Sequence, residues 1–326
     1  MGNRGATLIL LMILCFAVSS LVVLVNAEVS WVLWSQTYGG AGYEGLLHDV
    51  FLVETSDGGY ALFGSTYSFG AGMADFWLVK TDGSGNMEWN RTYGGASWDH
   101  ASSLVQTSDG GFALAGDTNS FSNGGYDFWL VKTDANGNEE WNRTYGQAND
   151  NMTSFNPSLV ETSDGGFALA GTTQYFGANS YFWLIKTDES GNMEWNQTYG
   201  ETGSEGHPSL IETSDGGFAL VGRIEYYVAY SADYWLVKTD GSGNMEWNKT
   251  YGGEQHDVVY SLVQTSDGGY ALAGTTKSFG AGNGDFWLVK TNEQGIPEFP
   301  PWIILPIFLV ITLFAIIIKK RLLNPH

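Results

Sequence analysis

The sequence predicts an all-β fold, a five-bladed β-propeller made of four-stranded repeats of about 52 residues. The first observation is an Asp-Gly-Gly stretch that recurs five times, at Asp57, Asp109, Asp164, Asp215 and Asp267. The spacing of 51 to 55 residues is typical of repeat architectures. The second observation is that each repeat holds four short apolar segments and no sustained helical periodicity. Four antiparallel strands per repeat is the content of one propeller blade.

The first two strands of each repeat flank the Asp-Gly-Gly triplet. In the second copy they are residues 103–107 and 112–116. The Ser-Asp-Gly-Gly between them predicts a hairpin turn, because Asp-Gly tolerates the positive φ angles of a tight reversal. A β-solenoid of parallel coils would not place a hairpin inside every repeat, so the propeller is favoured.

The third and fourth strands are recognised by their tryptophans. The third strand reads Phe-Trp-Leu-Val-Lys, with small changes, from Phe76, Phe128, Phe182, Tyr234 and Phe286. The fourth strand carries Trp34, Trp89, Trp141, Trp195 and Trp247. Because these ten tryptophans repeat with the blades, we expect them to pack between sheets and not to bind a ligand.

The order of the strands predicts how the ring closes. A fourth-strand sequence at Trp34 precedes the first repeat, whereas the last repeat ends at Lys290 without one. We therefore expect the N-terminal strand around Trp34 to complete the last blade.

The N-terminal residues 1–27 are interpreted as a signal peptide. Arg4 is followed by an apolar run and by Val25-Asn26-Ala27, small or aliphatic residues of the kind found at a cleavage site. The alternative is an uncleaved signal anchor. Residues 28–295 then form the exported propeller, and the only cysteine, Cys15, lies in the signal.

The C-terminal region predicts a membrane anchor. Residues 296–301 form a Pro-rich tether, residues 302–318 an apolar transmembrane helix, and residues 319–326 a basic tail. The basic cluster predicts a cytoplasmic C-terminus. The expected localisation is the cell membrane, in a single pass with a large extracellular domain.

The exported part is strongly acidic. Ten of the 14 Lys and Arg residues and all 35 Asp and Glu residues lie between positions 28 and 301, a net charge of −25. Such a surface repels nucleic acid, so no nucleic-acid partner is expected. Many of these aspartates also serve turns, which is an alternative reason for the acidity.

A metal site is one hypothesis for the segments before the first strands. These segments hold His48, His100 and His256 with Asp99 and Asp257. Their imidazole and carboxylate groups could ligate a metal if the ring brings them together. The alternative is that they are solvated loop residues. The turns that start at Asp82, Asp134, Asp188 and Asp240 alternate oxygen-bearing side chains, which makes calcium the one cofactor suggested. Their glycine position favours a plain hairpin turn.

Aromatic residues suggest a binding surface in the loops between the second and third strands. One ring per copy is shared and is expected to pack. Tyr175, Tyr181, Tyr226 and Tyr230 break the pattern, and such rings stack on sugars or contact proteins. Candidate glycosylation sites are Asn90, Asn142, Asn151, Asn196 and Asn248, each of which begins an Asn-x-Thr sequon.

The repeat resembles those of exported repeat propellers in bacteria and archaea, on the pattern Thr-Ser-Asp-Gly-Gly through Trp-Leu-Val-Lys-Thr-Asp to Trp-Asn. The Asp…Gly-Asn…Trp segment also resembles the tryptophan-docking repeat of quinoprotein dehydrogenases, although its spacing is one residue shorter. The sequence Ile296-Pro-Glu-Phe-Pro, a span and Lys-Lys-Arg resemble an archaeal PEF-type sorting signal. That resemblance implies processing by an archaeosortase-like enzyme and attachment to a lipid.

These observations predict that the protein is a binding or adhesion module for an extracellular glycan or protein. The alternatives are an extracellular polysaccharide-active enzyme of the glycoside hydrolase kind and, with less support, a quinoprotein-like dehydrogenase. A carboxylate pair from different blades facing one channel mouth would favour the hydrolase, and a bare aromatic platform would favour binding.

Overall fold

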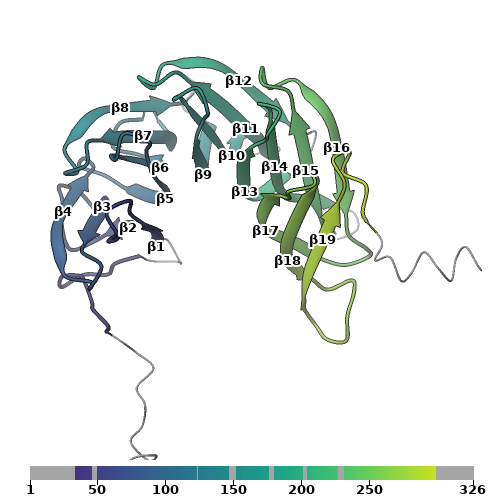
Figure 1. Ribbon diagram of the computed structural model, residues 1–326, viewed down its shortest axis with the longest axis horizontal. Helices are drawn as coiled ribbons and strands as arrows, with labels where there is room; N and C mark the ends of the chain where they lie inside the picture. The colour runs from purple at the N-terminus through teal and green to yellow at the C-terminus, as the bar shows by residue number, and fades with distance from the viewer. Residues whose placement is uncertain are drawn as a thin grey trace, which may run out of the picture.

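The computed structural model describes residues 34–45, 50–122, 124–146, 152–175, 180–200, 204–226 and 231–298. These residues form 19 strands in five antiparallel sheets that follow one another along an arc (Figure 1). The described part of the chain contains no helix, which confirms the all-β prediction. It therefore holds no helix able to cross a membrane. The predicted span 302–318 lies outside these residues.

Within each sheet the strands neighbour one another in sequence order. The first sheet contains β1 (Val50–Glu54), β2 (Tyr60–Thr66), β3 (Asp75–Thr81) and β4 (Met87–Tyr93). The second contains β5 (Asp99–Gln106), β6 (Phe112–Thr118), β7 (Asp127–Thr133) and β8 (Glu139–Tyr145). The third contains β9 (Met152–Glu161), β10 (Phe167–Tyr175), β11 (Ser180–Thr187) and β12 (Met193–Tyr199). The fourth contains β13 (Ser204–Glu212), β14 (Phe218–Tyr226), β15 (Ser231–Thr239) and β16 (Met245–Tyr251), and the fifth β17 (Asp257–Gln264), β18 (Tyr270–Thr276) and β19 (Asp285–Thr291).

The Asp-Gly-Gly triplet forms the predicted hairpin turn between the first two strands. In the first sheet Asp57 Oδ1 accepts hydrogen bonds from the Thr55 hydroxyl at 2.6 Å and from the Gly59 amide at 3.0 Å. Gly58 has a φ of 83°, a conformation that favours glycine. The other four turns repeat both bonds.

One lysine per sheet ties this turn to the start of the fourth strand. In the second sheet Lys132 Nζ lies 2.7 Å from Asp109 and 2.9 Å from Glu140, and its side chain is 7% exposed. An ammonium group at that burial needs such partners. This pairing explains why a lysine occurs near the end of each apolar third strand.

The hydrophobic core lies between the sheets. The ring of Phe76 contacts that of Trp129 in the next sheet, with centroids 4.6 Å apart. Four hydrophobic clusters form in this way, each shared by two neighbouring sheets. The third-strand tryptophans therefore pack between sheets, as predicted.

The predicted closure of the ring is not formed in this structure. Among the described residues the fifth sheet has three strands, and residues 34–38 form none. The arc stays open between the first and fifth sheets (Figure 1). Residues 34–38 pack on the first sheet instead of on β19: the Trp34 and Tyr60 ring centroids are 6.0 Å apart. The fold is thus an open, propeller-like arc of five sheets.

Candidate functional site

The sheets have two ends, which differ in character. We call the end where the second strand passes to the third the loop rim; it follows Thr66, Thr118 and Thr276 in three of the sheets. The opposite end carries the Asp-Gly-Gly turns. The described aromatic residues that break the repeat lie at or beside the loop rim.

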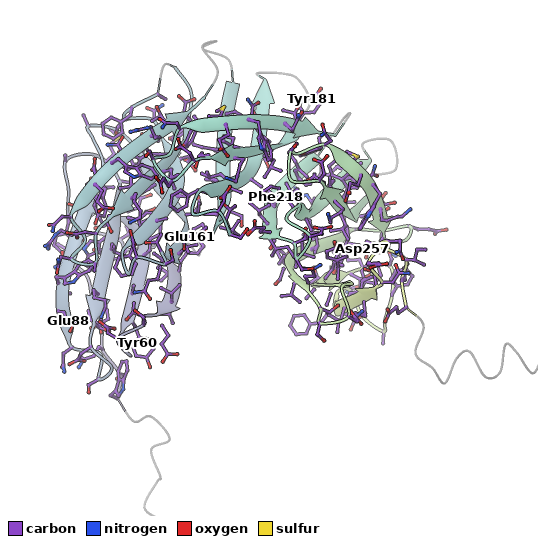
Figure 2. The ribbon with its side chains drawn as sticks, turned by 45° about the horizontal axis from the view of Figure 1, so that its top comes forward. Tyr60, Glu88, Glu161, Tyr181, Phe218 and Asp257 are labelled. Atoms are coloured by element: carbon purple, nitrogen blue, oxygen red, sulfur yellow. The ribbon has the colours of Figure 1, made fainter. Side chains whose placement is uncertain are left out.

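The predicted tyrosines lie in two neighbouring sheets at this rim. Strands β10 and β14 have nine residues, whereas β2, β6 and β18 have seven. Tyr175 and Tyr226 are the last residues of these longer strands. Tyr181 is half-buried on β11, across from Thr173, and is labelled in Figure 2. Tyr230 lies outside the described residues.

The rings that the loops share pack on the third-strand tryptophans, as expected. The centroid distances are 5.3 Å for Phe69 and Trp77, and 5.1 Å both for Phe121 and Trp129 and for Phe279 and Trp287. These rings therefore have a structural role in the first, second and fifth sheets.

The structure gives Asp99 and Asp257 a role in loop formation. Both are fully buried. Asp99 accepts hydrogen bonds from Gly95, Thr118 and Ser120, and Asp257 accepts bonds from Gly253 and Ser278. The two aspartates belong to different sheets, the second and the fifth.

The two described histidines among the proposed metal ligands, His100 and His256, lie at different sheets. His256 is exposed beside Asp257, whereas His48 lies outside the described residues. No group of three or more His, Cys, Asp or Glu side chains suited to a metal occurs in the part of the chain that the structure describes. His100 is placed differently, in an aromatic cluster.

In the turns considered for calcium binding, the aspartate oxygens accept hydrogen bonds from residues of the same turn. Asp82 accepts bonds from the amides of Ser84 and Asn86 and from the Asn86 side chain, all between 2.8 and 2.9 Å. The turns at Asp134, Asp188 and Asp240 repeat this pattern. The geometry is that of the expected hairpin turn.

Four of the predicted sequons lie on the outermost strands. Asn90, Asn142, Asn196 and Asn248 are exposed. Their side-chain Oδ1 atoms accept a hydrogen bond from the third-strand indole, for example from Trp77 Nε1 to Asn90 Oδ1 at 3.2 Å. Asn151 lies outside the described residues.

The most distinctive site is an aromatic box made by Tyr67, Trp98, His100 and Tyr126. The Trp98 ring stacks on His100, with centroids 5.8 Å apart and planes at 29°, and meets Tyr67 edge-on at 5.8 Å. His100 in turn lies 5.6 Å from Tyr126 at 31°. All four residues are half-buried.

Asp117 supplies the polar base of the aromatic box. His100 Nδ1 lies 3.1 Å from Asp117 Oδ2, and the two side chains are 30% and 3% exposed. Burial raises the pKa of the Tyr126 phenol, and the nearby Asp117 carboxylate adds to this effect. The Tyr126 hydroxyl therefore stays protonated at neutral pH.

Strand pairing positions these side chains. His100 lies directly across from Asp117 in the pair formed by β5 and β6. Trp98 pairs with Ala74 of the first sheet, and the Asp99 amide donates to the Ala74 carbonyl at 2.9 Å. The aromatic box thus spans the junction of the first two sheets at the loop rim.

None of Tyr67, Trp98, Asp117 and Tyr126 was singled out by the sequence analysis. Each is the one residue of its kind among five equivalent positions. The residues equivalent to Tyr126 are Ala74, Ser180, Ala232 and Gly284, and those equivalent to Asp117 are Ser65, Thr172, Arg223 and Thr275. Aligning the copies position by position would have shown these departures from the repeat.

No protein-family model matches the sequence, and no curated protein does either. Among solved structures, the NanB sialidase from Streptococcus pneumoniae matches with a TM-score of 0.54 and 10% identity, over 82% of this chain and 62% of that one. A protein of unknown function from Bacteroides caccae has a TM-score of 0.48 and 11% identity, over 82% and 85% of the two chains. The α-L-arabinanase of Penicillium chrysogenum has a TM-score of 0.44 and 14% identity, over 80% of this chain and 88% of that one. At these identities the sialidase match concerns the fold alone.

Proposed function

We propose that the protein is a five-bladed propeller at the cell surface that binds an extracellular glycan at the aromatic box. The observation that carries this proposal is the half-buried cluster of Tyr67, Trp98, His100 and Tyr126, in which His100 pairs with the buried Asp117. Aromatic faces with a few fixed polar groups are typical of ligand sites. The C–H faces of a sugar ring can pack on such rings while its hydroxyl groups bond to the polar atoms.

The charge of the protein favours an uncharged glycan. The exported region carries a net charge of −25, and the Asp117 carboxylate lies 3.1 Å from His100 Nδ1. Acidic sugars would be repelled by both. Neutral hexoses or pentoses fit the aromatic box best, and a protein partner is the runner-up.

The buried carboxylates argue against the hydrolase alternative. Asp75 of the first sheet and Asp99 of the second are close enough to interact: burial raises the pKa of Asp75, and the charge of Asp99 adds to it. Their exposed fractions are only 1% and 0%. A sugar ring cannot reach this pair, so these two residues cannot act as the flanking carboxylates of the common glycoside hydrolase mechanism.

A glycan array tests the proposal. The protein, purified as the cell produces it, should capture neutral glycans, and Trp98→Ala should abolish capture without lowering the melting temperature by more than a few degrees. His256→Ala is the matched control, because His256 is the equivalent residue in the fifth sheet. Equal capture by the Trp98→Ala variant would contradict the proposed site. Release of free sugar during the assay would indicate a hydrolase.

The same proposal includes anchoring through residues 296–318, with processing by an archaeosortase-like enzyme. The described chain ends at Glu298 beside Lys290, at the end of the sheets opposite the loop rim. An anchored protein would therefore present the aromatic box away from the bilayer. Cell fractionation with mass spectrometry of the C-terminal peptide tests this part. Soluble protein that retains residues 302–318 would contradict it.

A further inference from the structure

The four junctions between sheets share one contact. A third-strand ring packs on the third-strand tryptophan of the next sheet, at centroid distances of 4.6 Å for Phe76 and Trp129 and 5.1 Å for Phe128 and Trp183. The other two junctions repeat this contact, with centroids 5.0 Å apart for Phe182 and Trp235 and 4.7 Å apart for Tyr234 and Trp287. In each case the ring that reaches across is fully buried.

The fifth sheet has the same ring without this contact. Phe286 is 98% exposed and Leu288 is 70% exposed on β19, whereas all their equivalents in the other four sheets are fully buried. Two large apolar side chains at those exposures form an unpartnered apolar face.

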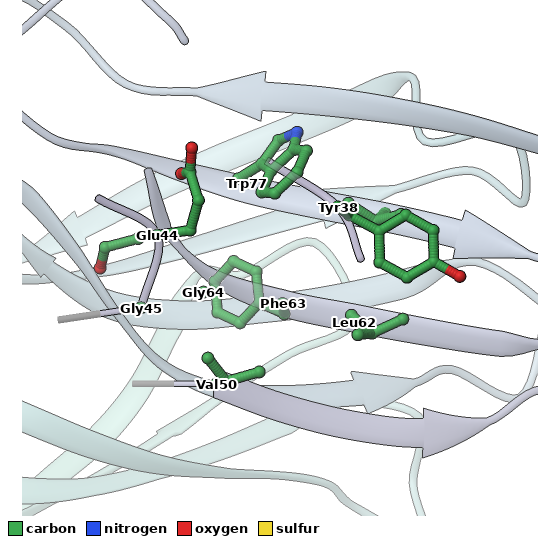
Figure 3. A pocket seen from close by; sticks show the side chains of 10 residues that line it. Tyr38, Glu44, Gly45, Val50, Leu62, Phe63, Gly64 and Trp77 are labelled. Atoms are coloured by element: carbon green, nitrogen blue, oxygen red, sulfur yellow. The ribbon is translucent and has the colours of Figure 1, made fainter. Parts of the chain in front are cut away.

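The first sheet presents the complementary surface. A pocket there is lined by Leu62, Phe63, Gly64, Trp77 and Val79 among others (Figure 3). In formed junctions the incoming ring lies against the glycine equivalent to Gly64, as Phe76 does at Gly116 and Phe182 at Gly222. The pocket therefore lies where the Phe286 ring would be placed by the same rule.

The N-terminal segment already lies where the missing fourth strand would contact the first sheet. Trp34 is 6.0 Å from Tyr60, and the equivalent pair Trp89 and Phe112 is 5.9 Å apart. The Tyr38 hydroxyl donates to the Gly85 carbonyl, as the hydroxyls of Tyr93, Tyr145, Tyr199 and Tyr251 do at the four formed junctions.

The C-terminal segment supplies the beginning of that same strand. Pro297 pairs with Thr291, as Met87 pairs with Thr81 in the first sheet. Glu298 lies 3.4 Å from Lys290, in the place that Glu88 takes beside Lys80. Pro300 and Pro301 follow in the sequence and cannot donate to a strand ladder, so the C-terminal segment cannot complete the strand.

We infer that the arc closes on itself, with a fourth strand in the fifth sheet that is built from both ends of the chain. Pro297 and Glu298 begin this strand and residues 34–38 complete it along β19. The register of the other sheets places Tyr38 across from Phe286, Ser35 across from Val289 and Trp34 across from Lys290. Phe286 then fills the pocket beside Trp77.

The inner strands add a further contact to the closed state. At existing junctions the Ser56 amide donates to Gln106, and the Ser108 amide to Glu161, which is labelled on the inner side of the arc in Figure 2. The equivalent pair for closure is Ser266 and Glu54. Both contact faces belong to one chain, so closure within one molecule has the advantage of high effective concentration over pairing with a second copy.

Cysteine pairs in the full-length protein, with Cys15→Ser as background, test the inferred register. Ser35→Cys with Val289→Cys should form a disulfide within the monomer, because opposed residues of antiparallel strands lie within disulfide range. Asn142→Cys with Val131→Cys is the positive control, since this equivalent pair is already formed in the second sheet. Ser35→Cys with Leu288→Cys, shifted by one residue, is the negative control.

Non-reducing electrophoresis with light scattering separates the outcomes. A linked monomer supports closure. A linked dimer would show pairing with a second copy and overturn the inference, as would absence of the link when the positive control forms. Phe286→Ala gives an independent reading: it should lower the melting temperature by roughly 5–15 °C in a closed ring. An unchanged melting temperature would show that Phe286 stays exposed.

Discussion

The imidazole of His100 stacks on the indole of Trp98, and its Nδ1 atom lies 3.1 Å from the buried carboxylate of Asp117. One side chain is thus part of both the aromatic surface and its polar base. This arrangement separates two contributions to binding, ring contact and hydrogen bonding. Substitutions can test the two contributions separately.

Tyr126→Phe should weaken glycan binding about fivefold, because it removes one hydroxyl group worth about 1 kcal/mol and keeps the ring against His100. Tyr126→Ala should weaken it further, since the ring is lost as well. Isothermal titration with the best glycan from the array measures both changes. Tyr260→Phe, an exposed tyrosine on β17, is the control. Equal affinity in both Tyr126 variants would show that the ring makes no contact with the sugar.

Lys186→Met should lower the free energy of unfolding by about 1–3 kcal/mol, the range for hydrogen bonds to charged groups. Lys186 Nζ lies 2.8 Å from Asp164 and 3.0 Å from Glu194, and its side chain is 6% exposed. Lys290→Met is the matched control, because Lys290 has equivalent partners at 31% exposure. Chemical denaturation should show the smaller loss for Lys290→Met. The reverse order would mean that burial of the ammonium group does not set the strength of this contact.

Acid should destabilise the protein through the same aspartates. Burial alone would raise their pKa, but hydrogen bonds from the lysine, a threonine hydroxyl and a glycine amide lower the pKa of Asp109, Asp164 and Asp215 to about 2. A pKa lowered by folding contributes stability above the unfolded value of 3.8. That contribution is lost as the pH falls from about 4 towards 2. The melting temperature should therefore decrease across this window, and a flat profile would contradict the assignment.

The repeat explains why so much of the fold could be predicted. Asp57 and Gly58 are close in sequence and determine their own turn, and the same short pattern recurs in each sheet. The aromatic box depends instead on lateral packing between sheets, which brings Tyr67 to Trp98 across 31 positions. A metal site at Asp99 and Asp257 stayed one hypothesis because residue type cannot distinguish a loop-capping carboxylate from a metal ligand. Ring closure was predicted from the order of the strands. In the structure residues 34–38 contact the first sheet, as closure requires, but they do not pair with β19.

Gly116→Ala should destabilise the protein by about 3 kcal/mol, because an added methyl group would collide with the backbone carbonyl of His100 and lie 2.6 Å from the Phe76 ring. The carbonyl belongs to a paired strand and cannot move aside cheaply. Gly284→Ala is the control: a methyl group there meets nothing within 4 Å, so its melting temperature should be unchanged or slightly higher. Differential scanning calorimetry of the two variants compares them directly. Equal melting temperatures would contradict this packing. They would show that the second strand tolerates a side chain at Gly116, where the first two sheets meet.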